Sequence, residues 1–174
     1  MDRQYRVLLN WAFFIAIAIL CVDAWTKYAV YSTFQESPFF FVEYPVFKDF
    51  WGIDFSITCV PNKGAAWGSF AGWQNTLLVV RISTVLALIG YLVFFNRDAF
   101  KVIPLTFIAA GALGNVIDTF VYGFVVDMFL FTFWGHDFAV FNVADAFITV
   151  GAVLLCINAF FEVNKVPHAG NTSD

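Results

Sequence analysis

Four long runs of apolar residues dominate the pattern of this chain, and shorter polar segments separate them. The runs cover about residues 7–30, 74–95, 102–122 and 140–161. Each contains about 20 residues, the number that an α-helix rising about 1.5 Å per residue needs to cross roughly 30 Å of hydrocarbon. The pattern therefore predicts an all-α, multi-pass integral membrane protein with four transmembrane helices, forming a single membrane domain over residues 1–174.

The composition supports this class and excludes several others. Of the 174 residues, 61% are hydrophobic and 13% are charged, whereas soluble domains are about half apolar and about a quarter charged. The net charge of −4 and the lack of a basic run argue against nucleic-acid binding. The three Cys and two His residues have no spacing typical of a disulfide framework or a metal site. We therefore expect no metal, no cofactor and no nucleic-acid partner.

The distribution of cations predicts how the chain is oriented in the membrane. The first run is too long for a cleaved signal peptide, and residues 23–27 do not form a small-residue cleavage site, so we expect a retained helix. Four spans place both termini on one side, which then carries most of the cations near the spans. These are Arg3, Arg6, Arg97, Lys101 and Lys165. The positive-inside rule predicts cytoplasmic termini and an outer-face segment over residues 31–73.

The outer-face segment 31–73 is strongly aromatic and has two interpretations. Residues Val42 to Phe47 and Ile53 to Val60 have strand-like composition and are separated by a short polar and glycine-containing stretch. One interpretation is an aromatic belt at the membrane interface. The other is a small sheet that lies on the membrane and covers a site below it. The aromatic stretch from Phe129 to Trp134 is predicted to face lipid or the interface rather than a cofactor.

Polar residues recur in the third and fourth runs at helical spacing. Asn115 and Asp118 are three residues apart and share a helix face, and Asn142 and Asp145 repeat this spacing. A further carboxylate, Asp127, follows the third run. Since the third run leads outward and the fourth inward, all three Asp residues should lie near the outer boundary. Ionisable groups at membrane depth are costly and are therefore candidates for a functional site.

Carboxylates at one depth suggest acid–base chemistry. Two close carboxylates do not both ionise cheaply, so they share a proton. One can then act as a base toward water, while the protonated partner donates to the carbonyl oxygen of a scissile bond. The alternative for each Asp is a helix cap or an interhelical hydrogen bond. This alternative is favoured for Asp118, whereas for Asp127 and Asp145 the pattern leaves both interpretations open.

Several motifs, in one order along the chain, together resemble a known family. They are Asp23-x-x-Thr26-Lys27, Asn62-Lys63-Gly64-Ala65-Ala66-Trp67-Gly68, Gly111-Ala112-Leu113-Gly114-Asn115-Val116-Ile117-Asp118, Gly123-Phe124-Val125-Val126-Asp127-Met128, and Phe141-Asn142-Val143-Ala144-Asp145 with Gly151. In these motifs the chain resembles the bacterial lipoprotein signal peptidases, also called signal peptidase II or prolipoprotein signal peptidase. The resemblance covers nearly the whole chain, and its order and spacing are more specific than any single motif.

This resemblance implies a fold, an activity and a site. It implies four transmembrane helices with a small outer-face β-sheet or cradle, in a bacterial cytoplasmic (inner) membrane. It implies an aspartic endopeptidase that removes the signal peptide from diacylglyceryl-modified prolipoproteins by cutting before the lipidated Cys. The catalytic dyad would be Asp127 and Asp145, near the outer face, with the substrate and membrane lipid as partners and a monomer as the expected state. The implied substrate-binding residues are Asn62, Gly64, Asn115, Asp118 and Asn142.

The chain leaves the family pattern at one position. Thr119 follows Asp118 where the family usually has Arg. Arg81, about 10 Å into the second span, is a candidate to compensate. The favoured alternative is that Arg81 extends toward lipid headgroups. Asp23 and Lys27, four residues apart, are predicted to form a structural ion pair that ties the first helix to the outer segment.

A hypothesis from a different functional class also fits four apolar helices. A non-enzymatic membrane channel, carrier or assembly factor could use the buried polar residues for packing or permeation. The joint presence of Asp127 and Asp145 with their Asn-containing motifs favours the peptidase. A channel has no need for the Asn62-x-Gly64 motif on an outer loop.

Overall fold

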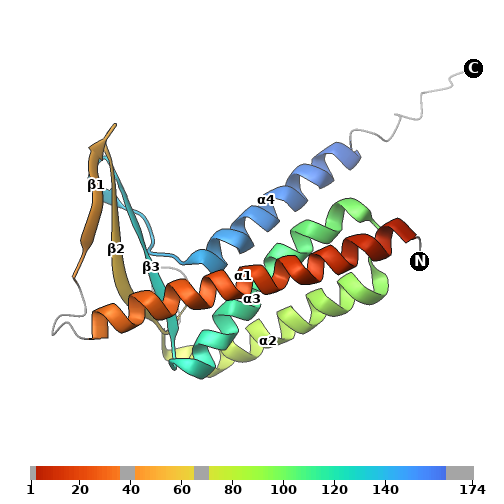
Figure 1. Ribbon diagram of the computed structural model, residues 1–174, viewed down its shortest axis with the longest axis horizontal. Coiled ribbons are helices and arrows are strands. Elements are labelled where there is room, and N and C mark those ends of the chain that lie inside the picture. The colour runs from red at the N-terminus through yellow and green to blue at the C-terminus, as the bar shows by residue number, and fades with distance from the viewer. Residues whose placement is uncertain (1–2, 36–41, 65–70, 164–174) are drawn as a thin grey trace, which may run out of the picture.

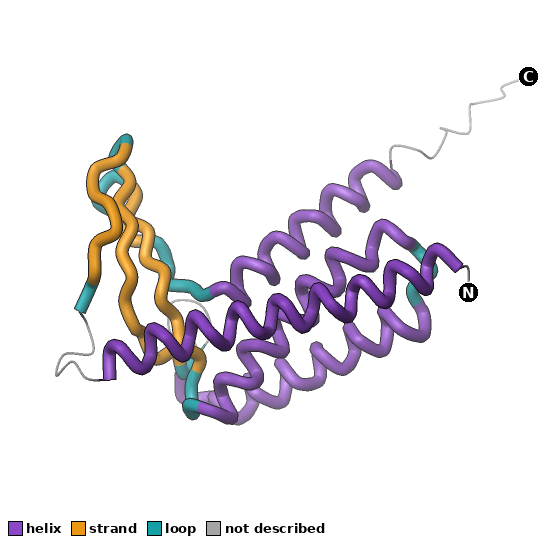
Figure 2. The backbone as a smooth tube through the Cα atoms, viewed as in Figure 1, coloured by secondary structure: helices purple, strands orange, loops and turns teal. Residues whose placement is uncertain are grey.

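The protein consists of a bundle of long helices with a small sheet at one end (Figures 1 and 2). The computed structural model describes residues 3–35, 42–64 and 71–163. Within these residues, four helices are long and apolar enough to cross a membrane. They are α1 (Arg3–Gln35), α2 (Gln74–Gly90), continued by the π-helical turn η3 (Tyr91–Phe95), α3 (Ala99–Val121) and α4 (Val143–Val163); the short 3-10 helix η2 (Ala71–Trp73) precedes α2.

The four long apolar helices predicted from the sequence are confirmed, but their boundaries differ from the predicted runs, and α3 begins at Ala99, three residues before the predicted residue 102. α1 extends beyond the predicted run 7–30 at both ends, because its polar flanks continue the helix past the apolar core. α4 begins at Val143, three residues after the predicted start at residue 140. The residues just before α4 are extended and form backbone hydrogen bonds with β3.

Helix α3 is the central helix of the bundle. Over half of its most apolar stretch, 56%, is buried, against 11–17% for the corresponding stretches of the other three helices. Small residues allow this close packing: a Cβ at Gly114 would lie 2.6 Å from Asp23 Oδ2, and one at Gly151 would lie 2.7 Å from the Pro104 carbonyl oxygen. Because the driving force for helix association in lipid is packing and polar contact, glycines at these contacts bring the backbones together.

The sheet is antiparallel and has the strand order β1-β2-β3-β4. Its strands are β1 (Tyr44–Phe50), β2 (Ile53–Asn62), β3 (Val125–Phe133) and β4 (His136–Asp137). The outer segment therefore forms a sheet rather than only an aromatic belt, in agreement with the second interpretation of its sequence. Residues 36–41 of that segment lie outside the described residues, as do residues 65–70, which include the end of the Asn62–Gly68 motif.

Strands β3 and β4 were not expected from the sequence. The aromatic stretch that ends at Trp134 belongs largely to β3, where Phe131 stacks on Phe55 of β2 at a centroid distance of 4.6 Å. Phe131 also stacks on Phe141, in the segment that leads to α4. The aromatic residues of β3 thus pack within the sheet, because a paired strand next to an aromatic β2 offers cross-strand partners.

Apolar side chains join the sheet to α1. Phe34 near the end of α1 is buried against Cys59 of β2 and against Val126 and Met128 of β3. Cys59 is therefore a small apolar filler of this cluster, and burial raises the pKa of its thiol. This cluster fixes β3 against the helix that carries Asp23.

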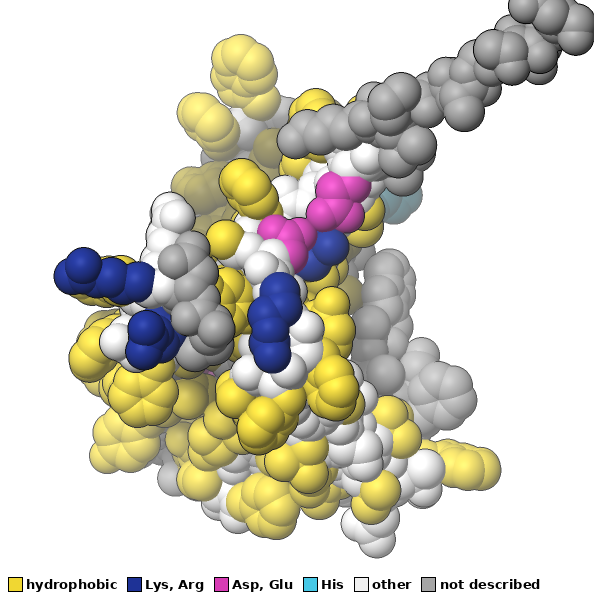
Figure 3. All heavy atoms as spheres, turned by 90° about the vertical axis from the view of Figure 1, so that its right-hand side faces the viewer, with side chains coloured by type: hydrophobic (Ala, Val, Ile, Leu, Met, Phe, Trp, Pro, Cys, Tyr) yellow, Lys and Arg dark blue, Asp and Glu magenta, His cyan; other side chains and the backbone are white. Residues whose placement is uncertain are grey.

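The opposite end of the bundle carries the N-terminal end of α1, the C-terminal end of α4 and the α2–α3 turn (Figure 1). Viewed from this end, Lys and Arg side chains stand out among the hydrophobic ones, with a small acidic patch beside them (Figure 3). Lys101 pairs there with Asp98 and Glu162, each at 3.2 Å. Lys165, which also entered the orientation prediction, lies outside the described residues.

Candidate active site

Asp145 lies in the first turn of α4, where it forms a reciprocal cap with Asn142. The Asp145 backbone N–H donates to Asn142 Oδ1 at 2.9 Å, and the Asn142 backbone N–H donates to Asp145 Oδ2 at 3.3 Å. Such reciprocal pairing satisfies the free N–H groups at a helix start. The spacing of three therefore marks a helix N-terminus, whereas the sequence interpretation placed both residues on one face of a continuous helix.

The segment before α4 runs along β3 and brings the cap to Asp127. The backbone N–H groups of Met128 and Phe129 donate to the Phe141 carbonyl at 3.0 and 2.8 Å. Asn142 follows directly and is fully buried. Its Nδ2 donates to Asp127 Oδ1 at 2.8 Å. One Asn side chain thus links the β3 carboxylate to the cap of α4.

Asn62 holds the second oxygen of Asp127. It is the last residue of β2, and the β2–β3 register pairs it with Val125, two residues before Asp127. Its Nδ2 donates to Asp127 Oδ2 at 2.8 Å, and its Oδ1 accepts from the Gly64 backbone N–H at 2.9 Å. The pairing of β2 with β3 is therefore what brings Asn62 to Asp127.

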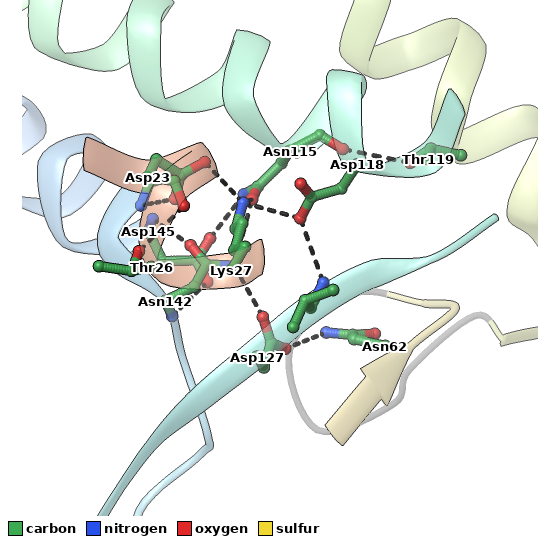
Figure 4. Close-up of polar contacts among 12 residues, drawn as sticks. Asp23, Thr26, Lys27, Asn62, Asn115, Asp118, Thr119, Asp127, Asn142 and Asp145 are labelled. Carbon is green, nitrogen blue, oxygen red and sulfur yellow. Dashed lines mark hydrogen bonds and ion pairs between the residues drawn. The ribbon is translucent and has the colours of Figure 1, made fainter. Parts of the chain in front are cut away.

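Asn115 of α3 connects Asp145 to the interior of the bundle (Figure 4). Its Nδ2 donates to Asp145 Oδ1 at 2.8 Å. Its Oδ1 accepts from Asn142 Nδ2 at 3.2 Å and from Lys27 Nζ at 3.0 Å. Because a cation donates to the amide oxygen, the amide is held with its nitrogen toward Asp145.

Lys27 lies at the centre of a buried ionic network. Its Nζ is 2.8 Å from a carboxylate oxygen of Asp23 and 2.8 Å from one of Asp118. Asp23 accepts from the Ala144 backbone N–H at 2.9 Å, and Asp118 accepts from the Val126 backbone N–H at 3.1 Å. The predicted Asp23–Lys27 pair is thus present, but its direct partners lie on α3 and α4, and it reaches the sheet through Asp118 and through Asn115 and Asn142.

The network leaves the site polar but satisfied. In the described part of the chain, every buried side-chain nitrogen and oxygen has a hydrogen-bond partner. Buried polar networks stabilise one arrangement only when all members are paired, so this arrangement holds Asn115 and Asp145 in fixed orientations. α1, α3, α4 and β3 each contribute to it, as Figure 4 shows.

Asp127 and Asp145 line one pocket of about 310 Å³ at the junction of the sheet and the bundle. The described residues that line it are Asn62, Arg81, Asn115, Val125, Asp127, Phe138, Ala139, Val140, Phe141, Asp145, Ile148 and Thr149. Half of these residues are apolar, and the two carboxylates come from different elements, β3 and α4. Such a pocket suits a peptide bond carried by an apolar substrate.

The pKa of Asp127 is raised from 3.8 to about 7. Burial is the main cause, and the negative charge of Asp145 adds to it, while the donors Asn62 and Asn142 act in the opposite direction. Asp127 is only 3% exposed, so desolvation of its charged form is strong. Near neutral pH this carboxyl group is therefore able to carry a proton beside a second carboxylate.

The sequence allowed two interpretations each for Asp118 and for Arg81. Asp118 is buried against Lys27 and does not belong to the described lining of the pocket. This placement matches the interhelical alternative favoured for it from the pattern. Arg81 does not extend away from the site, because its Nη2 donates to the Gly64 carbonyl at 2.7 Å. Thr119 uses its hydroxyl on its own helix, donating to the Asn115 carbonyl at 3.1 Å.

Sequence reasoning missed the apolar part of the pocket wall. Residues 138–141 line the pocket because they run beside β3, and Val140 and Phe141 were assigned to the fourth span. The signal for this was Asn142 followed three residues later by Asp145, which is a helix-start pattern. Among the described residues, no group of three or more His, Cys, Asp and Glu side chains is arranged to hold a metal ion.

Comparisons with known proteins show which family this chain resembles. The family profile described as signal peptidase (SPase) II matches residues 15–161. A lipoprotein signal peptidase of Staphylococcus haemolyticus is 32% identical over 169 residues, which cover 95% of this chain and 99% of the relative. A lipoprotein signal peptidase of Staphylococcus aureus is 33% identical over 161 residues, covering 90% and 91% of the two chains.

Solved structures show the same fold. One bacterial membrane enzyme has a TM-score of 0.74 and 28% sequence identity, covering 94% of this chain and 95% of its own. Another has a TM-score of 0.70 and 30% identity, covering 86% and 92%. With the family profile matching most of the chain, this protein belongs to the signal peptidase II family of peptidases.

Proposed function

We propose that this protein is an aspartic endopeptidase that cuts diacylglyceryl-modified prolipoproteins just before the lipidated Cys. Membership of the signal peptidase II family supports a peptidase that removes lipoprotein signal peptides, and it disfavours a channel or carrier. The observation that carries the aspartic mechanism is that Asp127 and Asp145 line one pocket and are joined through Asn142.

The mechanism follows from the unequal surroundings of the two carboxyl groups. Asp127, with a pKa of about 7, carries the proton and donates it to the carbonyl oxygen of the scissile bond. Asp145 takes a proton from water, whose oxygen attacks the carbonyl carbon. The C–N bond then breaks as Asp145 passes its proton to the leaving nitrogen, and a hydroxyl proton of the tetrahedral intermediate returns to Asp127. The products are a signal peptide with a free carboxyl group and a Cys with a free amine.

The three Asn side chains keep the two carboxylates in place during these steps. Asn62 and Asn142 donate to the two oxygens of Asp127, and Asn115 donates to Asp145. Each donor favours the ionised form of its carboxylate and so limits how far burial disfavours the charge. Lys27, behind Asn115, keeps that amide turned toward Asp145. These residues hold the acid and the base, so the substrate needs to supply only the peptide bond.

Lipid on the substrate has a clear physical role at this site. The pocket lies at one end of four helices that can cross a membrane, where the sheet meets the bundle. Each buried CH₂ of an acyl chain contributes about 0.8 kcal/mol to membrane binding, so two chains localise the Cys at one depth. The cation distribution supports cytoplasmic termini, and with that orientation this end lies at the outer face of a bacterial cytoplasmic membrane.

The test is cleavage of a matched pair of lipobox peptides by the purified protein in detergent. One peptide carries diacylglycerol on the Cys and the other does not, and mass spectrometry identifies both products. We expect cleavage of the lipidated peptide alone, with the new N-terminus at the Cys. Equal cleavage of both peptides would indicate a general intramembrane protease, and no cleavage of either would refute the proposal.

A further inference from the structure

Arg81 is a cation of the pocket that the proposed chemistry does not use. It lies in α2, which contributes none of the residues assigned to the dyad or its Asn donors. Its Nη2 donates to the Gly64 carbonyl at 2.7 Å, and its side chain lines the same pocket as Asp127 and Asp145. Among the described residues of the pocket wall, it is the one with a positive charge.

A continuous series of hydrogen bonds leads from Arg81 to Asp127. Gly64, whose carbonyl accepts from Arg81, donates its backbone N–H to Asn62 Oδ1 at 2.9 Å. The amide of Asn62 then donates Nδ2 to Asp127 Oδ2 at 2.8 Å. Since Asn62 Oδ1 is fixed by Gly64, its amide nitrogen points toward the carboxylate. Gly64 is therefore held on one side by Arg81 and on the other by Asn62.

Gly64 needs such support because glycine has the widest conformational freedom of any residue. It lies two residues after the end of β2, beyond the last register pair of the sheet. A hydrogen bond donated by a charged guanidinium group is stronger than a neutral one and has a defined direction. Strand pairing restrains Asn62, and the hydrogen bond from Arg81 restrains Gly64.

From these contacts we infer that Arg81 is a positioning residue for the dyad, acting through Gly64 and Asn62 on Asp127. The kinetic test of this inference rests on the proposed function, whereas the contacts that support the inference are independent of it. Arg81 holds the amide of Asn62 against Asp127 and so stabilises the ionised form of that carboxylate. Loss of Arg81 weakens the Asn62 donor and makes the Asp127 proton harder to remove.

The charged groups around Asp127 come from every helix packed near it. Asp145 faces it from α4, and its charge raises the pKa of Asp127, while Lys27 on α1 lowers it. Lys27 is itself shared with Asp118 of α3. Arg81 contributes from α2. The positive charge of Arg81 and the Asn62 donor that it holds in place both favour the ionised form of Asp127. Removal of Arg81 is therefore expected to make Asp127 harder to deprotonate.

The first experiment compares Arg81→Gln with Arg97→Gln. Arg97 also donates to a backbone carbonyl, that of Asn96 at 2.8 Å, but at the opposite end of the bundle. We expect kcat to fall about 10- to 100-fold in Arg81→Gln, as for loss of a hydrogen bond to a charged group, and to stay unchanged in Arg97→Gln. The alkaline limb of the pH–rate profile should move up by about half a unit to one unit.

The second experiment tests whether Arg81 acts through Asn62. In a double-mutant cycle with Asn62→Ala, the Arg81→Gln change should add little, because the last link to Asp127 is already removed. Strictly additive losses in kcat would overturn the inference. So would an Arg81→Gln variant with unchanged kcat, or one that loses thermal stability while keeping the wild-type pH profile.

A third measurement does not depend on turnover. Infrared titration of the protein in detergent, with Asp127→Asn to assign the carboxyl band, should show Asp127 losing its proton at higher pH in Arg81→Gln than in the wild type. An unshifted titration would overturn the inference. If the wild type cleaved no lipidated peptide, the proposed function would fail, whereas this titration would still decide the role of Arg81.

Discussion

The two ends of the α1–α3 contact are held together by opposite kinds of interaction. At the end near the termini, Tyr5 and Ala12 of α1 pack with Val102 and Leu105 of α3 in an apolar cluster. At the sheet end, the same two helices meet through Lys27 and its buried acidic partners. The apolar contacts bury no charge, whereas the ionic contacts require charged groups to be removed from water at membrane depth, which is costly.

The buried ion pairs at the sheet end orient side chains more than they add stability. An ion pair buried in a helix bundle is often no more stable than well-packed apolar residues of the same volume. Its value here lies in direction, because Lys27 turns Asn115 toward Asp145. The apolar end therefore determines that the helices associate, and the charged end determines how the carboxylates are oriented. Changes at the two ends should separate these effects.

The largest expected effect is the loss of either dyad carboxylate. Asp127→Asn and Asp145→Asn keep the shape of the side chain but remove the shared proton, so we expect turnover to fall about 10,000-fold or more. The apolar end provides the contrast: Leu105→Ala should lower thermal stability and leave kcat per folded molecule unchanged. Cleavage at a near-normal rate by either Asn variant would remove that residue from the mechanism.

The next largest effect concerns stability at the charged end. Lys27→Met leaves Asp23 and Asp118 facing each other without a cation, which should cost about 3–5 kcal/mol in the free energy of unfolding. Lys101→Met is the matched control, because its partners Asp98 and Glu162 lie at the surface of the other end. We expect that variant to unfold like the wild type. Equal unfolding midpoints for both Lys variants would contradict the contrast between the ends.

The third prediction is a pH dependence that belongs to the sheet end alone. Activity should fall as pH rises through about 7, where Asp127 loses its proton. Stability should follow the same direction, because the pKa of Asp127 is above its usual value of 3.8 in the folded state. The folded state then binds this proton more tightly than the unfolded state does, so stability is greatest below about pH 4 and declines toward pH 7. Denaturant unfolding of Asp127→Asn should lack this decline.

A smaller effect is expected at Thr119, where the chain departs from the family pattern. Thr119→Arg adds a second guanidinium group near the site, and like charges repel in a low-dielectric environment, so activity should fall about two- to fivefold. In an Arg81→Gln background, the same change should restore part of the lost rate. A full double-mutant cycle measures this coupling, and independence of the two changes would show that the two positions do not communicate.

The last prediction is that removal of metal ions has no effect on cleavage. Chelators should leave cleavage unchanged, because the site uses carboxyl and amide groups and we expect no metal. The measurement is cleavage of the lipidated peptide before and after dialysis against EDTA. If EDTA abolished cleavage and a divalent metal restored it, the aspartic mechanism would be refuted.

Much of the bundle was predictable because its pattern is local. Runs of about 20 apolar residues specify transmembrane helices without reference to any partner. The ion pair of Asp23 with Lys27 was predictable for the same reason, since a spacing of four places the side chains on one helix face. The strands β1 and β2 were also visible, but β3 was not, because an aromatic run near a membrane fits an interfacial loop equally well until its strand partner is known.

What the sequence determined by itself was the class of protein, its spans and the residues able to carry chemistry. The tertiary structure decided how these residues meet. Pairing of β2 with β3 brings Asn62 to Asp127, and the extended segment before α4 turns Asn142 and Asp145 into a helix cap beside them. It also decided that Arg81 contacts Gly64. Spacing along a chain sets the periodicity of one helix, whereas contacts between distant elements depend on packing that no local pattern records.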